Sequence, residues 1–394
     1  MEPIEQVNFI SRKIKEIPTL NPPFEYTDNL IVDFSRRVDD FYKLMKDLSK
    51  NKNLTILDGM SNSLRSIDVL KKGIISSIEY HLSGRLNDSY KKFEHALSYT
   101  RINEHIHKTA LPLNKIITNG TSYYRVRVSN TPLTHRRDLF HIPFNLRHLV
   151  KTQRFSISGL PCLYLGSSIL TCWHEMGKPD FDKLYISAFT IDKQLADMKI
   201  IHLAFNLTSA LSFSLSDHFD QRDLQFKLAK DKISNLIIWP LVLACHYKKK
   251  FNSNFNIEYI IPNLLMEWVY STKAKGIAGI AYQTTKFINP TNKKIEWNLI
   301  LPPKLNKIID SQASFCPTLV NTFKVTNPIS WQAFKTLHIH SMASQDKQTL
   351  RSTPNGGNID NFDEYLIENY DKTEFSSSEE IIKNLMKFNY LDQE

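Results

Sequence analysis

Three side chains capable of nucleotide chemistry follow one another at regular spacing in the middle of the chain. Arg154 lies ten residues before Tyr164, and Glu175 lies eleven residues after Tyr164. A planar cation can hold a pyrophosphate, an aromatic face can stack on a ring, and a carboxylate can stabilise an oxocarbenium-like transition state. Each residue alone is more often a surface or core residue. Together they match what cleavage of a nicotinamide N-glycosidic bond requires.

The segment TQRFSISGLPCLYLGSS, residues 152–168, predicts the elements that position these side chains. GLP favours a turn, CLYLG a short apolar strand, and Ser167 occupies the position of a helix cap. SSILTCWHEM then predicts a helix of about three turns. On that helix, one stripe packs inward and a second stripe faces polar surroundings. The inward stripe contains Ile169, Cys172, Trp173 and Met176, and the polar stripe contains Ser168, Thr171 and Glu175.

The remaining patterns divide the chain into a helical part and a mixed part. Residues 1–118 are typical of helices, with apolar residues at three- and four-residue steps, namely Leu57, Met60, Leu64, Ile67, Leu70, Ile74 and Ile78. From residue 117, ITNGTSYYRVRVSN predicts a strand that carries Arg125 and Arg127 on one face. LYISAFTI and KIIHLAF predict further strands, NLIIWPLVLACHY and IEYIIPNLLMEWVYS predict helices, and GIAGIAYQTT and WNLILPP complete this part.

The composition limits the class of protein without choosing its partner. The 50 Lys and Arg against 40 Asp and Glu give a net charge of +10, which favours anionic partners. No run approaches the roughly 18 consecutive apolar residues of a membrane helix, so we expect a cytoplasmic protein without membrane contact. The four cysteines favour packed thiols over disulfides. A zinc site from Cys162, Cys172, His141 and His174 has looser spacing than structural zinc sites, and we expect no metal.

The region after Phe315 predicts an irregular extension. A polar linker is expected near residues 341–361, and residues 358–394 carry ten acidic residues against three lysines, a local net charge of −7. The acidic stretch has two interpretations. It is either a built-in inhibitor that lies across a basic cleft or an ordinary packed tail.

The segments YYRVRVSN, LFHIPFNLRHLVKTQRFSISGLPCLYLGSSILTCWHEM, FNIEYIIPNLLMEWVYSTKAKGIAGIAYQTT and WNLILPP resemble the RES-domain family, over about residues 123–303. The family's fold is similar to that of diphtheria-toxin-like ADP-ribosyltransferases. The resemblance implies a RES domain of mixed, mainly antiparallel sheets and helices at 119–310. Together with the helical pattern of residues 1–118 and the irregular acidic extension expected at 311–394, it gives an α+β protein as the expected fold class.

The resemblance also implies roles for individual residues. Arg125 matches the family's leading arginine, Arg154 the arginine that holds NAD phosphates, Tyr164 the nicotinamide-stacking aromatic, and Glu175 the carboxylate beside the scissile bond. The family's signature serine is absent from GIAYQTT, where Thr284 and Thr285 stand instead. Threonine keeps the hydroxyl and adds a methyl group.

Studied members of the family are toxins that consume NAD or transfer ADP-ribose. We therefore expect an NAD glycohydrolase or phosphorylase acting as a toxin or defence effector, with NAD as substrate. The alternatives are a mono-ADP-ribosyltransferase for a protein or nucleic acid and a catalytically silent NAD-binding module. Expected partners are an antitoxin or regulatory protein and a second copy bound through the N-terminal helices. Arg101 and His107 leave a helical nuclease of the HEPN type as a further alternative.

Overall fold

The computed structural model describes residues 2–58, 60–99, 102–117, 121–191, 198–203, 229, 232–271, 274, 276–286, 296–305, 314–341, 367 and 369–392. The chain forms two compact units. The first contains Met1–Leu111, Thr152–Ile157 and Lys199–Ile277, and the second contains Pro112–Lys151, Ser158–Met198 and Ala278–Glu394. This division differs from the domains expected from the sequence, because residues 199–277 group with the N-terminal helices. Arg101 and residues 342–361 of the expected linker lie outside the described residues.

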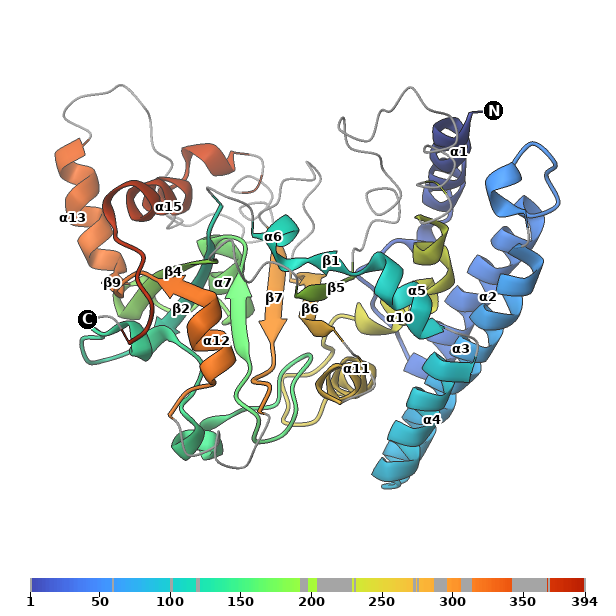
Figure 1. The fold of residues 1–394 in the computed structure, drawn as a ribbon, viewed down its shortest axis with the longest axis horizontal. Coiled ribbons are helices and arrows are strands. Elements are labelled where there is room, and N and C mark those ends of the chain that lie inside the picture. Colours follow the sequence, from blue (N-terminus) through green and yellow to red (C-terminus); the bar gives the residue numbers. More distant parts are fainter. Residues whose placement is uncertain are drawn as a thin grey trace. The chain divides into compact units, whose positions relative to one another are not determined.

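The first unit consists mainly of helices (Figure 1). In α3, the predicted stripe is confirmed, because Ile67, Leu70, Ile74 and Ile78 are almost fully buried. Asn29 caps α2 by accepting hydrogen bonds from the amides of Ile31 and Val32. The helices are α1 (Pro3–Lys15), α2 (Leu30–Leu48), α3 (Met60–Leu82), α4 (Leu86–Tyr99), α5 (Ile102–Thr109), α10 (Trp239–Cys245) and α11 (Ile260–Tyr270), and strand β5 spans Lys199–Leu203. The short strand β1 spans Leu111–Pro112.

The second unit is built on an antiparallel sheet with the strand order β6–β7–β3–β2–β4–β8, and β9 pairs with β4. The strands are β2 (Tyr123–Val128), β3 (Leu163–Gly166), β4 (Leu184–Ile191), β6 (Ile277–Gln283), β7 (Trp297–Leu301), β8 (Phe323–Val325) and β9 (Ile329–Ser330). Its helices are α6 (Leu113–Ile116), α7 (Ile169–Glu175), α12 (Pro317–Thr322), α13 (Trp331–Ser341) and α15 (Glu374–Leu385). The mixed architecture and the mainly antiparallel pairing agree with the expected fold class.

Alternation along β2 decides which side chains meet the helices. Tyr124 and Val126 point into an apolar core with residues of α7, α13 and α15, as predicted for that face of the strand. Arg125 belongs to the opposite face and pairs in register with Ser187 of β4. The strand therefore has one apolar face under the helices and one basic face.

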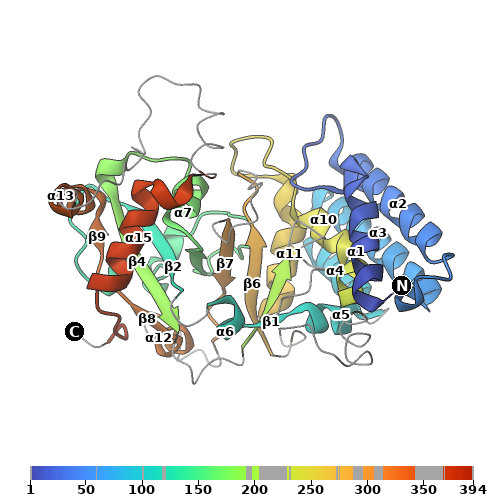
Figure 2. The same ribbon diagram turned by 90° about the horizontal axis from the view of Figure 1, so that it is seen from above.

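The C-terminal region is not an irregular extension, contrary to the sequence-based expectation. Helices α13 and α15 supply Trp331, Phe334, Phe375 and Ile382 to the core that also contains Trp173 of α7. Both views of the ribbon show α15 beside α7 (Figures 1 and 2). Although the segment is acidic overall, helix α15 has an apolar face that packs into this core. The described part of the acidic stretch is thus a packed element of the second unit.

Helix α7 is shorter than predicted and begins one residue later. Its cap is Ser168, whose hydroxyl accepts from the Thr171 amide at 3.0 Å. Ser167 instead contacts strand β7, where its Oγ accepts a hydrogen bond from the amide of Trp297 at 2.9 Å. The helix ends at Glu175, so Met176 leaves the inward stripe and is 40% exposed. The two predicted polar side chains in its first turn, Ser168 and Thr171, are buried and bonded to each other.

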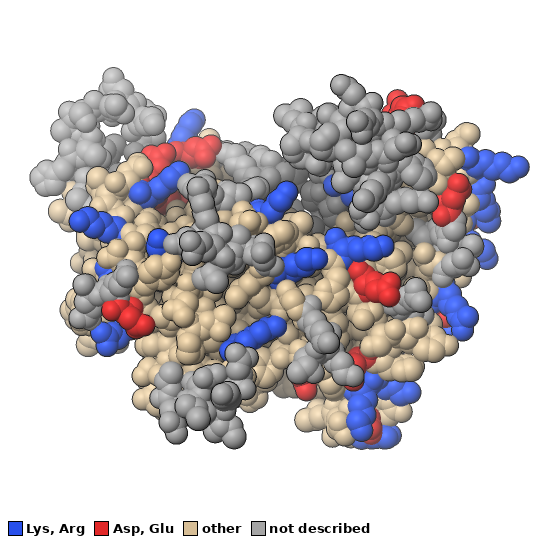
Figure 3. Space-filling view, in the orientation of Figure 1, with Lys and Arg blue, Asp and Glu red and all other residues tan. Residues whose placement is uncertain are grey.

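Figure 3 shows one face of the molecule, on which lysine and arginine side chains lie in many places and adjoin one another along the right edge. Among the described helices, none combines the length and the apolar character needed to cross a membrane.

Gly166 allows α7 to approach β3, and we predict that Gly166→Ala destabilises the second unit. A Cβ at this position would lie 2.6 Å from Cys172 Sγ and 3.2 Å from the Ser168 carbonyl oxygen. Overpacking of this kind costs about 1–3 kcal/mol. Thermal unfolding of Gly166→Ala measures the loss, and Lys183→Ala at an exposed position provides the control. Equal melting temperatures for both variants would contradict the close packing.

Candidate active site

Glu175 lies at the end of α7, where two side chains from other elements hold its carboxylate. Its Oε1 accepts a hydrogen bond from Thr284 Oγ1 at 2.6 Å and from Asn298 Nδ2 at 2.8 Å. Within the described parts of the chain, no hydrogen bond to its Oε2 is found. Glu175 is half-buried. The protein therefore fixes one oxygen of this carboxylate through two donors.

The sheet register explains why Asn298 reaches Glu175. Asn298 of β7 pairs with Gly166 of β3 and with Tyr282 of β6. Gly166 in turn pairs with Tyr124, which lies on the face covered by α7. Paired residues of antiparallel strands share a face. Asn298 therefore points to the same side of the sheet as the helix that ends in Glu175.

Thr284 follows β6 directly and is fully buried. Its amide donates to the Glu296 carbonyl at 2.8 Å, and its hydroxyl accepts from the Lys286 amide at 3.1 Å. The same hydroxyl has one proton, which it donates to Glu175. Of the two threonines predicted in place of a serine, Thr284 is the one bonded to the carboxylate. Thr285 is also buried.

Tyr164 and Arg125 meet where β2 and β3 run side by side. Arg125 Nη1 donates to the backbone carbonyl of Tyr164 at 2.9 Å. This bond ties the Arg125 side chain to the backbone of β3, while residue 125 itself belongs to the sheet face opposite to α7. The register places the Tyr164 side chain on the face of Asn298 and α7, and the ring is half-buried. Tyr164, Glu175, Thr284 and Arg125 thus belong to one unit.

Arg125 is a cation in surroundings that penalise charge. Burial, followed by the charge of nearby Arg127, lowers the pKa of Arg125 to about 10, so the guanidinium stays charged at neutral pH. Its buried Nε has no hydrogen-bond acceptor among the described residues, and the same holds for Ser187 Oγ, its neighbour across β4. Buried donors without acceptors are rare and need an explanation. An anionic group or an ordered water would satisfy them.

Arg154 lies in the other unit and is engaged by the protein itself. Its Nη1 and Nη2 donate to the carbonyls of Cys245 and Tyr247, each at 2.6 Å, and its guanidinium lies over the Tyr259 ring at 5.0 Å. The side chain is buried. Glu175 and Tyr164 belong to the second unit. This geometry suits a structural cation, and its expected role in phosphate binding stays a prediction.

Sequence reasoning missed Asn298, Glu379 and Tyr370 in this region. Asn298 is the one polar residue in the apolar segment WNLILPP, and this isolated amide is a signal that could have identified it. Glu379 of α15 accepts hydrogen bonds at Oε1 from the Ile169 amide and from the Tyr370 hydroxyl, both at 2.6 Å. Burial raises the pKa of Glu379 to about 8. No local pattern links this glutamate to a helix that lies about 200 residues earlier.

The described residues offer little for metal binding. No group of three or more His, Cys, Asp or Glu side chains with a suitable arrangement occurs among them. His141, named above as a possible zinc ligand, bonds the Ile142 carbonyl through Nδ1 at 2.8 Å and accepts from the Cys316 amide at Nε2 at 2.9 Å. Burial lowers the pKa of His141 to about 4. Both ring nitrogens are therefore already used.

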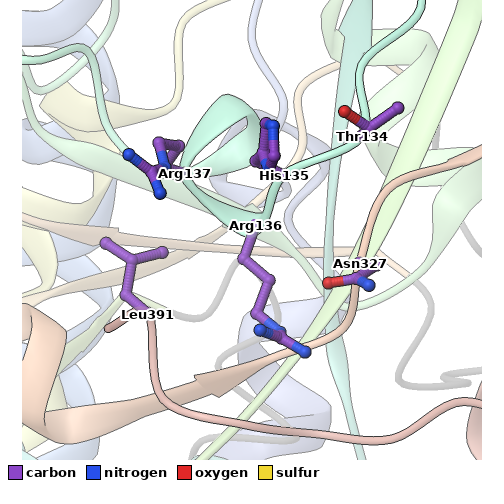
Figure 4. Close-up of a pocket in the computed structure, with 6 residues that line it drawn as sticks. All are labelled: Thr134, His135, Arg136, Arg137, Asn327 and Leu391. Carbon is purple, nitrogen blue, oxygen red and sulfur yellow. The ribbon is translucent and has the colours of Figure 1, made fainter. Parts of the chain in front are cut away.

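A cavity of about 260 Å³ in the second unit contains none of the predicted site residues. It is lined by Thr134, His135, Arg136, Arg137, Asn327 and Leu391. Figure 4 shows Arg136 and Arg137 pointing in different directions. Arg136 Nε donates to the Val325 carbonyl at 3.1 Å. The cationic groups thus do not converge on one point, and Glu175 remains the better centre for a site.

The chain is similar to a protein of Bacillus subtilis (strain 168) whose name is "Putative toxin YopC". The two are 32% identical over 299 residues, which are 75% of this chain and 65% of the relative. The chain thus spans slightly less than two thirds of the length of that relative. No family model matches the chain, and no solved structure matches it.

We predict that Arg154→Ala lowers stability. The substitution leaves two backbone carbonyls without their charged donor, and a hydrogen bond to a charged group contributes about 1.5–3 kcal/mol. Thermal unfolding measures the effect, with the exposed Lys151→Ala as control. A melting temperature equal to that of the wild type, together with weaker ligand binding, would instead support the phosphate-binding role.

We also predict that Glu379 makes stability fall as the pH rises. Its pKa is about 8 in the folded protein and 4.5 in its ordinary state, so between these values the folded state holds a proton that the unfolded state releases. The stabilisation is complete below pH 4.5 and is lost as the pH rises through 8. Glu379→Gln should flatten this part of the profile of melting temperature against pH. The exposed Glu380→Gln is the matched control, and identical profiles for all three proteins would contradict the shift.

Proposed function

We propose that this protein degrades NAD in the manner of RES-domain toxins, by breaking the bond between nicotinamide and ribose. The observation that carries the proposal is the Glu175 carboxylate, held at one oxygen by Thr284 and Asn298. A carboxylate that is already oriented needs no reorganisation when positive charge develops beside it. Of the residues that the family resemblance singled out, all but Arg154 lie in the same unit, namely Arg125, Tyr164, Glu175, Thr284 and Thr285.

The chemistry follows from the charges involved. As the bond from the ribose C1′ to the nicotinamide nitrogen lengthens, its electron pair leaves with nicotinamide and positive charge grows on the ribose. Glu175 stabilises that charge through its second oxygen. An acceptor then forms the new bond to C1′. With water as acceptor, the products are ADP-ribose, nicotinamide and a proton. Phosphate as acceptor would give a phosphorylase.

Arg125 and Tyr164 supply the binding groups in this proposal. Arg125 remains a cation despite its burial, and its Nε lacks an acceptor among the described residues. The pyrophosphate of NAD is an anion of the kind that a guanidinium binds well. The half-buried Tyr164 ring offers a face on which nicotinamide can stack. Thr284 takes the place of the family's serine, because its hydroxyl bonds Glu175 directly.

The biological setting is part of the proposal. A toxin that consumes NAD would also harm the cell that makes it, so a bound antitoxin is the partner we propose. The relative named as a toxin supports this setting. The location in the cytoplasm and a homo-oligomer formed by the N-terminal helices stay predictions.

The test is to incubate the purified protein with NAD and to quantify nicotinamide, ADP-ribose and labelled macromolecule, with and without phosphate. We expect nicotinamide release and a loss of about 10²–10³-fold in kcat for Glu175→Gln. Thr284→Val removes a hydrogen bond to a charged group and should cost roughly tenfold. Thr284→Ser should stay close to the wild type, and Thr285→Val should lose less than Thr284→Val.

The products separate the alternatives. Label on a protein or nucleic acid would favour an ADP-ribosyltransferase, and NAD binding without cleavage would favour a silent binding module. RNA cleavage that His107→Ala abolishes would favour the nuclease. The proposal fails if the wild type releases no nicotinamide or if Glu175→Gln releases it at the wild-type rate.

A further inference from the structure

We propose that the C-terminal segment is a working part of the active site, in which Glu379, held by Tyr370, fixes the first turn of α7 and so positions Glu175 at the other end of the helix. This inference rests on the proposed function for its catalytic consequence. Glu379 and Tyr370 are positioning residues in this scheme, because Glu379 bonds the first amide of α7 and Tyr370 bonds Glu379.

The polar contacts supply hydrogen-bond acceptors to the N-terminal amides of α7. The first amides of a helix have no acceptor within the helix. In α7, Ser168 Oγ accepts from the Thr171 amide at 3.0 Å, and Glu379 Oε1 accepts from the Ile169 amide at 2.6 Å. The Tyr370 hydroxyl donates to the same Glu379 oxygen at 2.6 Å and so orients the carboxyl group. Two separate parts of the chain therefore complete one helix end.

The apolar contacts show that α15 holds the body of α7 as well as its start. Trp173 of α7 lies 5.8 Å from the Phe375 ring of α15 and 5.0 Å from the Phe181 ring, between centroids. Ile169 and Leu170 share the same core with Ile382. These contacts bury apolar side chains of α7 in the core that the strands β2 and β4 also line. The C-terminal segment thus supplies both a polar and an apolar contact to the same short helix.

The length of α7 makes these contacts matter for Glu175. The helix has seven residues, and helices of this length do not persist without tertiary packing. Its rise of about 1.5 Å per residue separates its ends by only about 10 Å. Glu175 must meet Thr284 and Asn298 at hydrogen-bond distance. A shift of about 1 Å in a catalytic group can cost 10²-fold in rate. Loosening the first turn would therefore displace the Glu175 carboxylate from its hydrogen-bond partners.

The experiment uses the full-length protein and compares Glu379→Ala, Glu379→Gln and Tyr370→Phe, with the exposed Glu380→Ala as control. Glutamine keeps an oxygen that can accept both hydrogen bonds, whereas alanine removes it. We expect Glu379→Ala to lower kcat for nicotinamide release by about 10- to 100-fold with little change in KM. Glu379→Gln should restore most of the rate, and Tyr370→Phe should give an intermediate loss.

Hydrogen exchange provides a readout that does not depend on NAD cleavage. In Glu379→Ala, the amides from Ile169 to Glu175 should exchange faster than in the wild type, and in Glu379→Gln they should not. If the wild type releases no nicotinamide but this exchange pattern holds, the proposed function is wrong and the positioning of α7 is supported. Unchanged exchange in Glu379→Ala would overturn the inference.

A core variant separates positioning from a general loss of stability. Phe375→Leu removes aromatic packing from the same helix and leaves Glu379 in place. The inference is supported if Glu379→Ala loses more kcat than Phe375→Leu at an equal melting temperature. It is overturned if kcat depends on the melting temperature alone in both variants, or if Glu379→Gln is as impaired as Glu379→Ala.

Discussion

The hydrogen bonds from Thr284 and Asn298 to Glu175 join a helix, a strand and the end of a second strand. They also oppose an electrostatic cost. Glu175 is the last residue of α7, and the C-terminal end of a helix carries a partial negative charge that disfavours a carboxylate. Two donors at hydrogen-bond distance offset this repulsion and hold the group in one orientation. A position that is poor for the stability of the helix thereby becomes suitable for stabilising a developing positive charge.

Arg125 represents a second cost of the same kind. A buried guanidinium beside Arg127 is unfavourable, which is why burial and the neighbouring charge lower its pKa to about 10. The Tyr164 carbonyl satisfies one donor, and the Nε is left without an acceptor in the described structure. Burying such a group costs free energy of folding unless a bound anion or another acceptor offsets that cost. The same reasoning does not apply to Arg154, whose two terminal nitrogens already bond backbone carbonyls.

The acidic C-terminal stretch illustrates how composition can mislead. Its net charge left two interpretations open, a built-in inhibitor or an ordinary packed tail, and Phe375, Ile382 and Tyr370 of the described part pack into the core around α7. Charged residues on one face of a helix do not prevent an apolar face from packing. The contact between Glu379 and the Ile169 amide then places this stretch at the beginning of the helix that presents Glu175. The region expected to be an appendage is part of the framework of the site.

Local patterns in the sequence determined most of the elements. Three- and four-residue spacing in α3 predicted which side chains are buried, because this period follows from backbone geometry alone. Alternation in β2 predicted the shared buried face of Tyr124 and Val126, although Val128 of the same face is exposed and Tyr123 of the other face is buried. Local patterns also placed Glu175 on a polar helix face. The choice of Ser168 over Ser167 as the cap was missed, because Ser167 is bonded to the distant Trp297.

Tertiary structure alone decided which residues share the site. A hydrogen bond to Glu175 distinguishes Thr284 from Thr285 as the residue of the site. The register of β7 adds Asn298 to the site, and the fold brings Glu379 from the C-terminal region to the start of α7. Arg154 was directed to backbone carbonyls of its own unit. The spacing of residues along a chain predicts which of them lie on the same face of a helix or strand. Distances between elements depend on sheet register and packing, which arise only when the whole unit folds.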